Sequence, residues 1–75
     1  MTPEDVVSKV FGVERRAITD ATSNTTVAEW DSLGHMTLVV ELEATYAVAL
    51  SPEDALAMTD VAAIKRVLAS RGASW

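Results

Sequence analysis

The 75-residue chain contains no cysteine, which excludes disulfides, thiol catalysis and thiolate metal sites together and fits a cytoplasmic setting. Aromatic residues are scarce, at 5% of the sequence, so a core must be built chiefly from Val, Leu, Ala, Ile and Met, a composition that suits packed helices. A domain this small buries only about 60% of the surface that its unfolded chain exposes. We therefore expect a single domain over residues 1–75, stabilised by its apolar core alone.

Long apolar runs and a secretory leader are also missing. Glu4 and Asp5 lie where a signal peptide would carry a basic flank. The longest apolar stretches, such as residues 47–50, are far shorter than the roughly 20 residues that span a membrane. We expect a soluble cytoplasmic monomer with no membrane association, and Met1 with the short tails favours a freestanding chain.

Basic residues are absent from the middle of the chain. The net charge is −5, and every Lys and Arg lies before residue 17 or after residue 64. Acids occupy the segment between them, namely Asp20, Glu29, Asp31, Glu41, Glu43, Glu53, Asp54 and Asp60. Nucleic acids are therefore not expected as partners, because neutralising phosphates needs clustered Lys and Arg. The acidic segment favours docking onto basic protein surfaces, although acids that only keep a small protein soluble are the alternative.

The first two of four expected helices have clear signals. Thr2 and Pro3 form an N-cap and first-position pair before a helix at about residues 3–11, which Gly12 can end. Apolar spacing predicts a second helix at residues 32–46. Its apolar stripe comprises Leu33, Met36, Val40 and Ala44, widened by Val39, Leu42 and Tyr46.

A long connection over residues 12–30 separates these helices, and loops of this length tend to be functional or disordered. Val13, Ile18, Val27 and Trp30 can anchor it to the core, which favours an ordered loop. The cluster of Thr, Ser and Asn at its centre leaves a locally flexible linker as the alternative.

The remaining helices follow close together. Ser51 and Pro52 repeat the opening pattern of the first helix and predict a short helix at about residues 53–57. Thr59 or Asp60 can cap a last helix at about residues 60–70. No alternation typical of strands competes with this interpretation. The expected fold class is all-α, a small four-helix bundle of three longer helices and one short helix.

Ser32 follows the acid Asp31 and begins the second helical pattern. A serine at the start of a helix lies at the positive end of the helix dipole, where free backbone N–H groups can meet a phosphate. The residues alone leave open the alternative that Asp31 and Ser32 are both ordinary capping residues.

Asp31, Ser32 and the only histidine, His35, resemble a catalytic triad compressed into one helical turn. However, Asp31 adjoins Ser32 and is poorly placed to orient the imidazole from its far side. The chain has no Gly-x-Ser-x-Gly motif and little room for an enclosed substrate pocket. We expect no catalytic residue, and no metal site, because calcium-loop spacing is lacking and one histidine cannot build a zinc site.

Other candidate side chains are interpreted as structural. We expect His35 to be an exposed first-turn residue, Trp30 to anchor the loop, and Trp75 at the end of the chain to be frayed. Met36 and Met58 are interpreted as core side chains.

The run Asp31-Ser32-Leu33, followed by a helix with apolar and acidic residues that ends in Tyr46, resembles the signature of the acyl carrier protein family. The first helix, the long loop, the short helix and the last helix follow in the expected order, so the resemblance covers nearly the whole chain. It implies an acyl-carrier-protein-like bundle in which Ser32 carries a covalent 4′-phosphopantetheine, donated by coenzyme A. The thiol of this arm would hold an acyl or aminoacyl group as a thioester, and the protein would be a non-catalytic carrier.

The resemblance also implies partners. These are a phosphopantetheinyl transferase, an acyl- or aminoacyl-loading enzyme, and downstream synthases or transferases. Members of the family dock through the second helix on basic patches of such enzymes. The residues available for docking here are Asp31, Leu33, Met36, Glu41 and Glu43.

Gly34 and Thr37 occupy positions where carriers of fatty-acid synthesis commonly have acids. The run from Glu29 to Met36 is more similar to discrete carriers of polyketide, nonribosomal peptide or related specialised biosynthesis. We favour these over a fatty-acid-synthesis carrier. The alternative from a different class is an unmodified acidic helical docking module in which Ser32 is only a cap.

Overall fold

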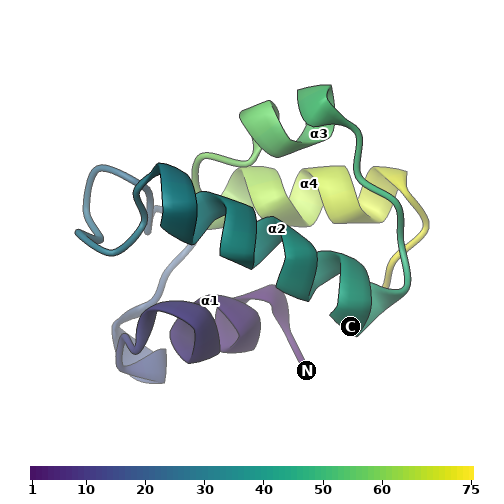
Figure 1. Cartoon of the computed structure of the whole chain (residues 1–75). Coiled ribbons are helices and arrows are strands. Elements are labelled where there is room, and N and C mark those ends of the chain that lie inside the picture. Colours follow the sequence, from purple (N-terminus) through teal and green to yellow (C-terminus); the bar gives the residue numbers. More distant parts are fainter.

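The computed structural model describes residues 1–75 and contains four α-helices and no strand. The helices are α1 (Pro3–Phe11), α2 (Ser32–Tyr46), α3 (Pro52–Ala57) and α4 (Val61–Ser70), with one 3₁₀ turn, η1 (Arg15–Ala17), in the long loop (Figure 1). The expected all-α fold of three longer helices and one short helix is confirmed. The sequence signals did not predict η1.

The helix boundaries follow from their caps. Thr2 Oγ1 accepts from the Asp5 N–H at 3.3 Å, and the Asp5 carboxylate accepts from the Thr2 N–H at 2.8 Å, which forms a capping box. Gly12 ends α1 with a φ of 68°, a conformation that favours glycine. Asp60 caps α4 through the Ala63 N–H, so α4 begins at residue 61 rather than 60.

The core lies where α1, α2 and α4 meet, and the long loop closes one end of it (Figure 1). Its buried apolar side chains are Val6, Val7, Phe11, Ile18, Val27, Trp30, Leu38, Leu42, Met58, Val61, Ile64 and Leu68. Three of the four expected loop anchors are therefore buried, and Val13 packs against the core while partly exposed.

Backbone hydrogen bonds also join the loop to the start of α4. The Val61 N–H donates to the Thr22 carbonyl at 3.0 Å, and the Asn24 N–H donates to the Thr59 carbonyl at 3.1 Å. Ser23 and Asp60 form an isolated bridge between the same segments. These bonds and the buried anchors attach the loop to the core and to α4, as expected of an ordered loop.

The inward face of α2 differs from the expected stripe. Leu38 and Leu42 are fully buried, whereas Leu33, Met36 and Val40 are 77%, 66% and 63% exposed. The predicted stripe is therefore wrong for Leu33, Met36, Val40 and the exposed Ala44, and the interpretation of Met36 as a core residue is wrong with it. The residues expected to widen the stripe do face the core, since Leu42 is buried and Val39 and Tyr46 pack against the core. Apolar residues occur on all sides of α2, so spacing alone does not define which side faces the core. Met58, interpreted in the same way, is fully buried.

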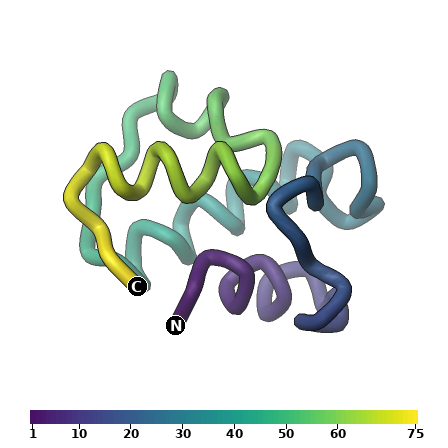
Figure 2. The backbone as a smooth tube through the Cα atoms, turned by 180° about the vertical axis from the view of Figure 1, so that it is seen from behind, coloured from purple at the N-terminus to yellow at the C-terminus, as the bar shows by residue number.

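The two ends of the chain meet at the C-terminal end of α2 (Figure 2). The Tyr46 hydroxyl donates to the Met1 carbonyl at 2.8 Å. The rings of Tyr46 and Trp75 form an edge contact with centroids 6.0 Å apart, so Trp75 packs on the bundle rather than fraying as expected. None of the helices has the length and apolar composition needed to cross a membrane.

Candidate functional site

Trp30 fixes the end of the loop directly before α2. Its side chain is only 2% exposed and stacks on Phe11 of α1, with ring centroids 5.3 Å apart and an interplanar angle of 28°. The expected anchoring role of Trp30 is confirmed. Because a large buried ring resists displacement, the first turn of α2 has a fixed position against α1.

Asp31 and Ser32 have different roles in this turn. Asp31 is the N-cap of α2, since its Oδ1 accepts from the Gly34 N–H at 2.8 Å and its carbonyl accepts from the His35 N–H at 2.7 Å. Ser32 is the first helical residue and its side chain is exposed. The cap is supplied by Asp31 alone, so the Ser32 hydroxyl stands free at the positive end of α2.

Gly34 lies where the loop backbone approaches α2 most closely. A Cβ atom at this position would overlap the Glu29 carbonyl oxygen and lie 2.9 Å from Cε1 of Phe11. Residue 34 therefore has no space for a side chain. The first turn of α2 contains no acid, and the acid next to Ser32 is the N-cap residue Asp31.

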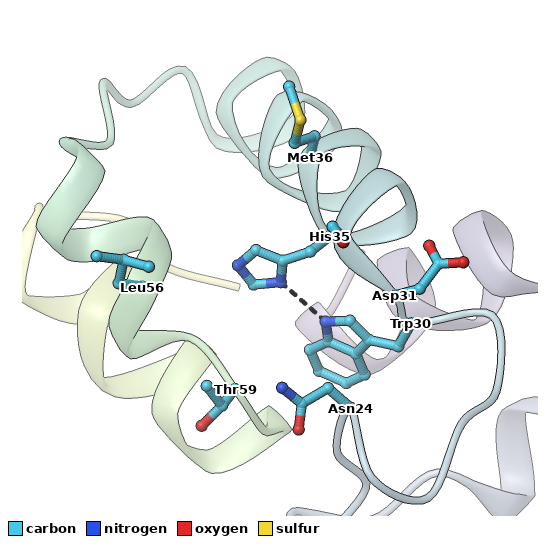
Figure 3. A pocket seen from close by; sticks show the side chains of 8 residues that line it. Asn24, Trp30, Asp31, His35, Met36, Leu56 and Thr59 are labelled. Carbon is cyan, nitrogen blue, oxygen red and sulfur yellow. Dashed lines mark hydrogen bonds between the residues drawn. The ribbon is translucent and has the colours of Figure 1, made fainter.

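His35 is half-buried, which corrects the expectation of an exposed first-turn residue. Nδ1 accepts from the indole N–H of Trp30 at 2.8 Å (Figure 3). Nε2 lies 2.6 Å from the Ala55 carbonyl oxygen. The imidazole also stacks on the indole with centroids 6.3 Å apart. Both ring nitrogens are thus engaged away from Ser32, so the compressed triad is not formed.

An open groove of about 420 Å³ lies beside Ser32, between α2, α3 and the loop (Figure 3). Its lining residues are Asn24, Trp30, Asp31, Ser32, His35, Met36, Leu56 and Thr59. Met36 lies on the α2 side, and Leu56, which is 78% exposed, lies on the α3 side. Sequence analysis missed Asn24, Leu56 and Thr59. Only Leu56 had a signal, since it is a large apolar residue in a short polar helix.

The residues expected to dock partners fall into two groups. Asp31, Leu33 and Met36 are exposed in the first two turns of α2, close to Ser32 along the helix. Glu41 and Glu43 lie further along α2 and have partners within the chain. The Glu41 carboxylate is 3.3 Å from Lys9 Nζ, and Glu43 accepts from the Leu50 N–H at 2.9 Å.

Helix α3 buries none of its own residues, so polar contacts hold it in place together with the fully buried Met58 that follows it. The Ser51 N–H donates to the Asp54 carboxylate at 3.0 Å, and Arg71 binds the same carboxylate through two nitrogens at 2.8 and 2.9 Å. The Ser51 N–H, followed by the Arg71 guanidinium, holds the pKa of Asp54 below its ordinary value. At its other side, α3 is linked to α2 through the bond between His35 and Ala55.

No group of three or more acidic or histidine side chains lies together in a way that could hold a metal ion. The site therefore offers a free hydroxyl at a helix start and an open groove beside it, with Met36 and Leu56 at its edges. This arrangement suits a surface serine that is modified by another enzyme, with room beside it for a flexible attached group.

The chain is a four-helix bundle with an exposed serine at the start of its second helix, an arrangement that leaves the serine hydroxyl accessible to another enzyme. The family model for the phosphopantetheine attachment site matches residues 4–68, so the chain belongs to this family, which is of the acyl carrier protein type. Its domains attach 4′-phosphopantetheine covalently and are generally non-catalytic carriers. No curated protein matches the chain.

Proposed function

We propose that Ser32 is the attachment residue and that this chain carries acyl or aminoacyl intermediates as thioesters on a 4′-phosphopantetheine arm. The observation that carries the proposal is the division of roles at the start of α2, where Asp31 supplies the cap and leaves the Ser32 hydroxyl exposed. Ser51, the serine at the start of α3, differs from Ser32, because the Ser51 hydroxyl is engaged as a cap and accepts from the Asp54 N–H at 3.1 Å.

The transfer would be catalysed by a phosphopantetheinyl transferase. The Ser32 hydroxyl loses its proton to a base of that enzyme and forms a phosphoester with the phosphopantetheine phosphate of coenzyme A, which releases adenosine 3′,5′-bisphosphate. The chain itself contributes an exposed hydroxyl and a helix N-terminus that favours the phosphate charge. We propose no catalysis by the chain, since the only histidine has both ring nitrogens engaged by Trp30 and Ala55.

Intact-mass analysis tests this assignment directly. The protein is incubated with coenzyme A and a broad-specificity transferase, and we expect a gain of one phosphopantetheine unit in the wild type and none in Ser32→Ala. Ser74→Ala is the matched control, because Ser74 is also exposed, and it should be modified like the wild type. An unmodified wild-type chain would favour the docking-module alternative, and a modified Ser32→Ala would move the attachment residue elsewhere.

We further propose that the pathway is polyketide, nonribosomal peptide or related specialised biosynthesis, with fatty-acid synthesis as the alternative. The close approach of Glu29 to Gly34 supports this preference, because it leaves no room for the acid that fatty-acid carriers commonly have there. The mass of the group carried by the protein in its native cell would distinguish these pathways.

Loading enzymes and downstream synthases or transferases are proposed to dock beside Ser32. The exposed side chains Leu33, Met36 and Val40 support an apolar contact, and Asp31 adds one negative charge at the modified end. Glu41 and Glu43 remain candidates for docking, but their carboxylates already have partners within the chain. A monomeric carrier in the cytoplasm stays a prediction.

A further inference from the structure

The short helix α3 is held from two sides by different polar contacts. On one side, Arg71, the C-cap residue of α4, binds the Asp54 carboxylate with two hydrogen bonds. On the other side, His35 of α2 contacts the Ala55 carbonyl at 2.6 Å. Helix α3 buries none of its own side chains, and Met58 directly after it is fully buried in the core, so these polar contacts act together with that anchor to place α3 relative to α2 and α4.

The partners of His35 define its protonation state. The indole N–H of Trp30 can only donate, so Nδ1 of His35 must be the unprotonated acceptor. The proton of the neutral imidazole is then on Nε2, where it donates to the Ala55 carbonyl. Trp30 is buried and stacked on Phe11, so the chain of contacts runs from α1 through the loop and α2 to α3.

The two residues joined by this contact, His35 and Ala55, are sequence neighbours of the two apolar residues at the edges of the groove. His35 precedes Met36 on α2, and Ala55 precedes Leu56 on α3. Met36 and Leu56 both line the groove beside Ser32 and are largely exposed. Figure 3 shows His35 between the elements that carry Met36 and Leu56. A change in the bond between His35 and Ala55 would therefore change the separation of the two apolar side chains.

We propose that His35 is a positioning residue, which sets the width of the groove beside Ser32 by joining the indole of Trp30 to the Ala55 carbonyl. An enzyme that binds the carrier at Ser32 then meets Met36 and Leu56 at a fixed separation. The inference rests on the proposed function for its effect on partner enzymes, whereas the contact itself is a property of the unmodified protein.

Nuclear magnetic resonance of the unmodified protein tests the contact. Long-range proton–nitrogen spectra should show that the His35 imidazole is neutral and protonated at Nε2. Its Nδ1 should have the chemical shift of an unprotonated nitrogen that accepts a hydrogen bond, here from the Trp30 indole. Protonation at Nδ1, or an indole N–H that exchanges as fast as an exposed one, would overturn the proposal.

Hydrogen exchange of His35→Leu and His35→Gln tests the effect on α3. Leu removes both bonds, so exchange of the α3 amides should accelerate by about 2- to 10-fold while the amides of α1 and α4 keep their rates. Gln can place an amide N–H near the position of Nε2 and should restore most of the protection. If folded His35→Leu keeps the α3 rates, or Gln fails to restore them, His35 does not position α3. If His35→Leu does not fold, wild-type protection of α3 in His35→Gln still decides the point.

Modification kinetics with coenzyme A and the transferase give the functional readout. His35→Leu should raise the KM for the carrier by about 2- to 10-fold and leave kcat within about twofold, because Ser32 itself is unchanged. Arg71→Ala is the control, since it releases α3 from α4 but leaves the His35 contact intact, and it should raise KM less. Equal KM values for the two variants would overturn a specific role of His35. A wild type that is never modified would refute the assignment of Ser32, while the exchange data would still report on the contact.

Discussion

Helices α2 and α4 are both rich in apolar residues, but α4 buries its large apolar side chains whereas α2 leaves several of its own exposed. In α4, Val61, Ile64 and Leu68 are all fully buried, so its apolar residues serve the core. In α2 only Leu38 and Leu42 are buried, and Leu33, Met36 and Val40 face solvent. The difference indicates that α4 contributes to stability, whereas the outer side of α2 carries apolar surface that the fold does not need.

The cost of leaving large apolar residues exposed is offset if another protein covers them during part of the carrier's cycle. Single exposed apolar residues scattered over a surface are normal. Here, however, three of them lie on the helix that begins at Ser32, the proposed attachment residue. The comparison between α2 and α4 therefore separates residues that hold the fold from residues that are available to partners.

The largest expected effect comes from truncating the core. Leu68→Ala in α4 and Leu38→Ala in α2 should each lower the free energy of unfolding by about 2–5 kcal/mol, because both side chains are fully buried and leave cavities. Urea unfolding followed by circular dichroism measures this loss. Leu33→Ala is the matched control in the same helix, since Leu33 is 77% exposed, and its stability should stay within about 0.5 kcal/mol of the wild type.

Leu33→Ala should instead slow modification by the transferase, at low and high salt alike, because an apolar contact is not screened by ions. If Leu33→Ala and Leu38→Ala lost equal stability, the division of α2 into a side that holds the fold and a side available to partners would be wrong. A rate defect that vanishes at high salt would show that charges such as Asp31, not the apolar side chains, dominate docking.

A smaller effect is expected where α2 meets the loop. Gly34→Ala gains helix propensity of about 1 kcal/mol but forces a Cβ against the Glu29 carbonyl and Phe11, which costs more. We expect a net destabilisation of about 1–2 kcal/mol in urea unfolding. Thr45→Ala, at an exposed position of the same helix, should be neutral or slightly stabilising. A stabilised Gly34→Ala would mean that the loop can move away from α2.

The smallest effect concerns the polar contacts of α3. The Ser51 N–H and Arg71 lower the pKa of Asp54 in the folded state, so the ionised carboxylate stabilises the fold above the ordinary Asp pKa near 4. This contribution is lost as the pH falls below that value toward the folded-state pKa. Asp54→Asn should therefore be less stable than the wild type at pH 7, and the difference should shrink in acid. A difference that persists at pH 2 would show that the charge of Asp54 is not its source.

Much of the fold could be predicted from local signals. The capping residues Thr2, Ser51 and Asp60 mark helix starts because their side chains satisfy backbone N–H groups within a few residues, and such contacts depend only on nearby sequence. Gly12 marks an end for the same kind of reason. The attachment of the loop to the core through Trp30 could also be predicted from the sequence, because a large aromatic ring in a polar loop is rarely left exposed.

The inner face of α2 and the role of His35 could not be predicted in this way. The direction of α2 depends on the core that α1, the loop and α4 build with it, which includes Leu38 and Leu42 but not Leu33 and Met36. His35 contacts a carbonyl 20 residues further along the chain, and nothing in the local sequence indicates that approach. Both the inner face of α2 and the contacts of His35 are set by packing between segments far apart in the sequence. Helical periodicity does not indicate which face is buried when apolar residues occur on all sides of the helix.

The contact of Tyr46 with Met1 and Trp75 has a practical consequence for handling the protein. Tyr46 ends α2 and Ser32 begins it, so the length of the helix separates Ser32 from both chain ends by about 20 Å. A fusion partner, fluorophore or surface linker joined at either terminus would therefore sit at the opposite pole from Ser32. Immobilised protein should present the end that carries Ser32 outward whichever terminus is used.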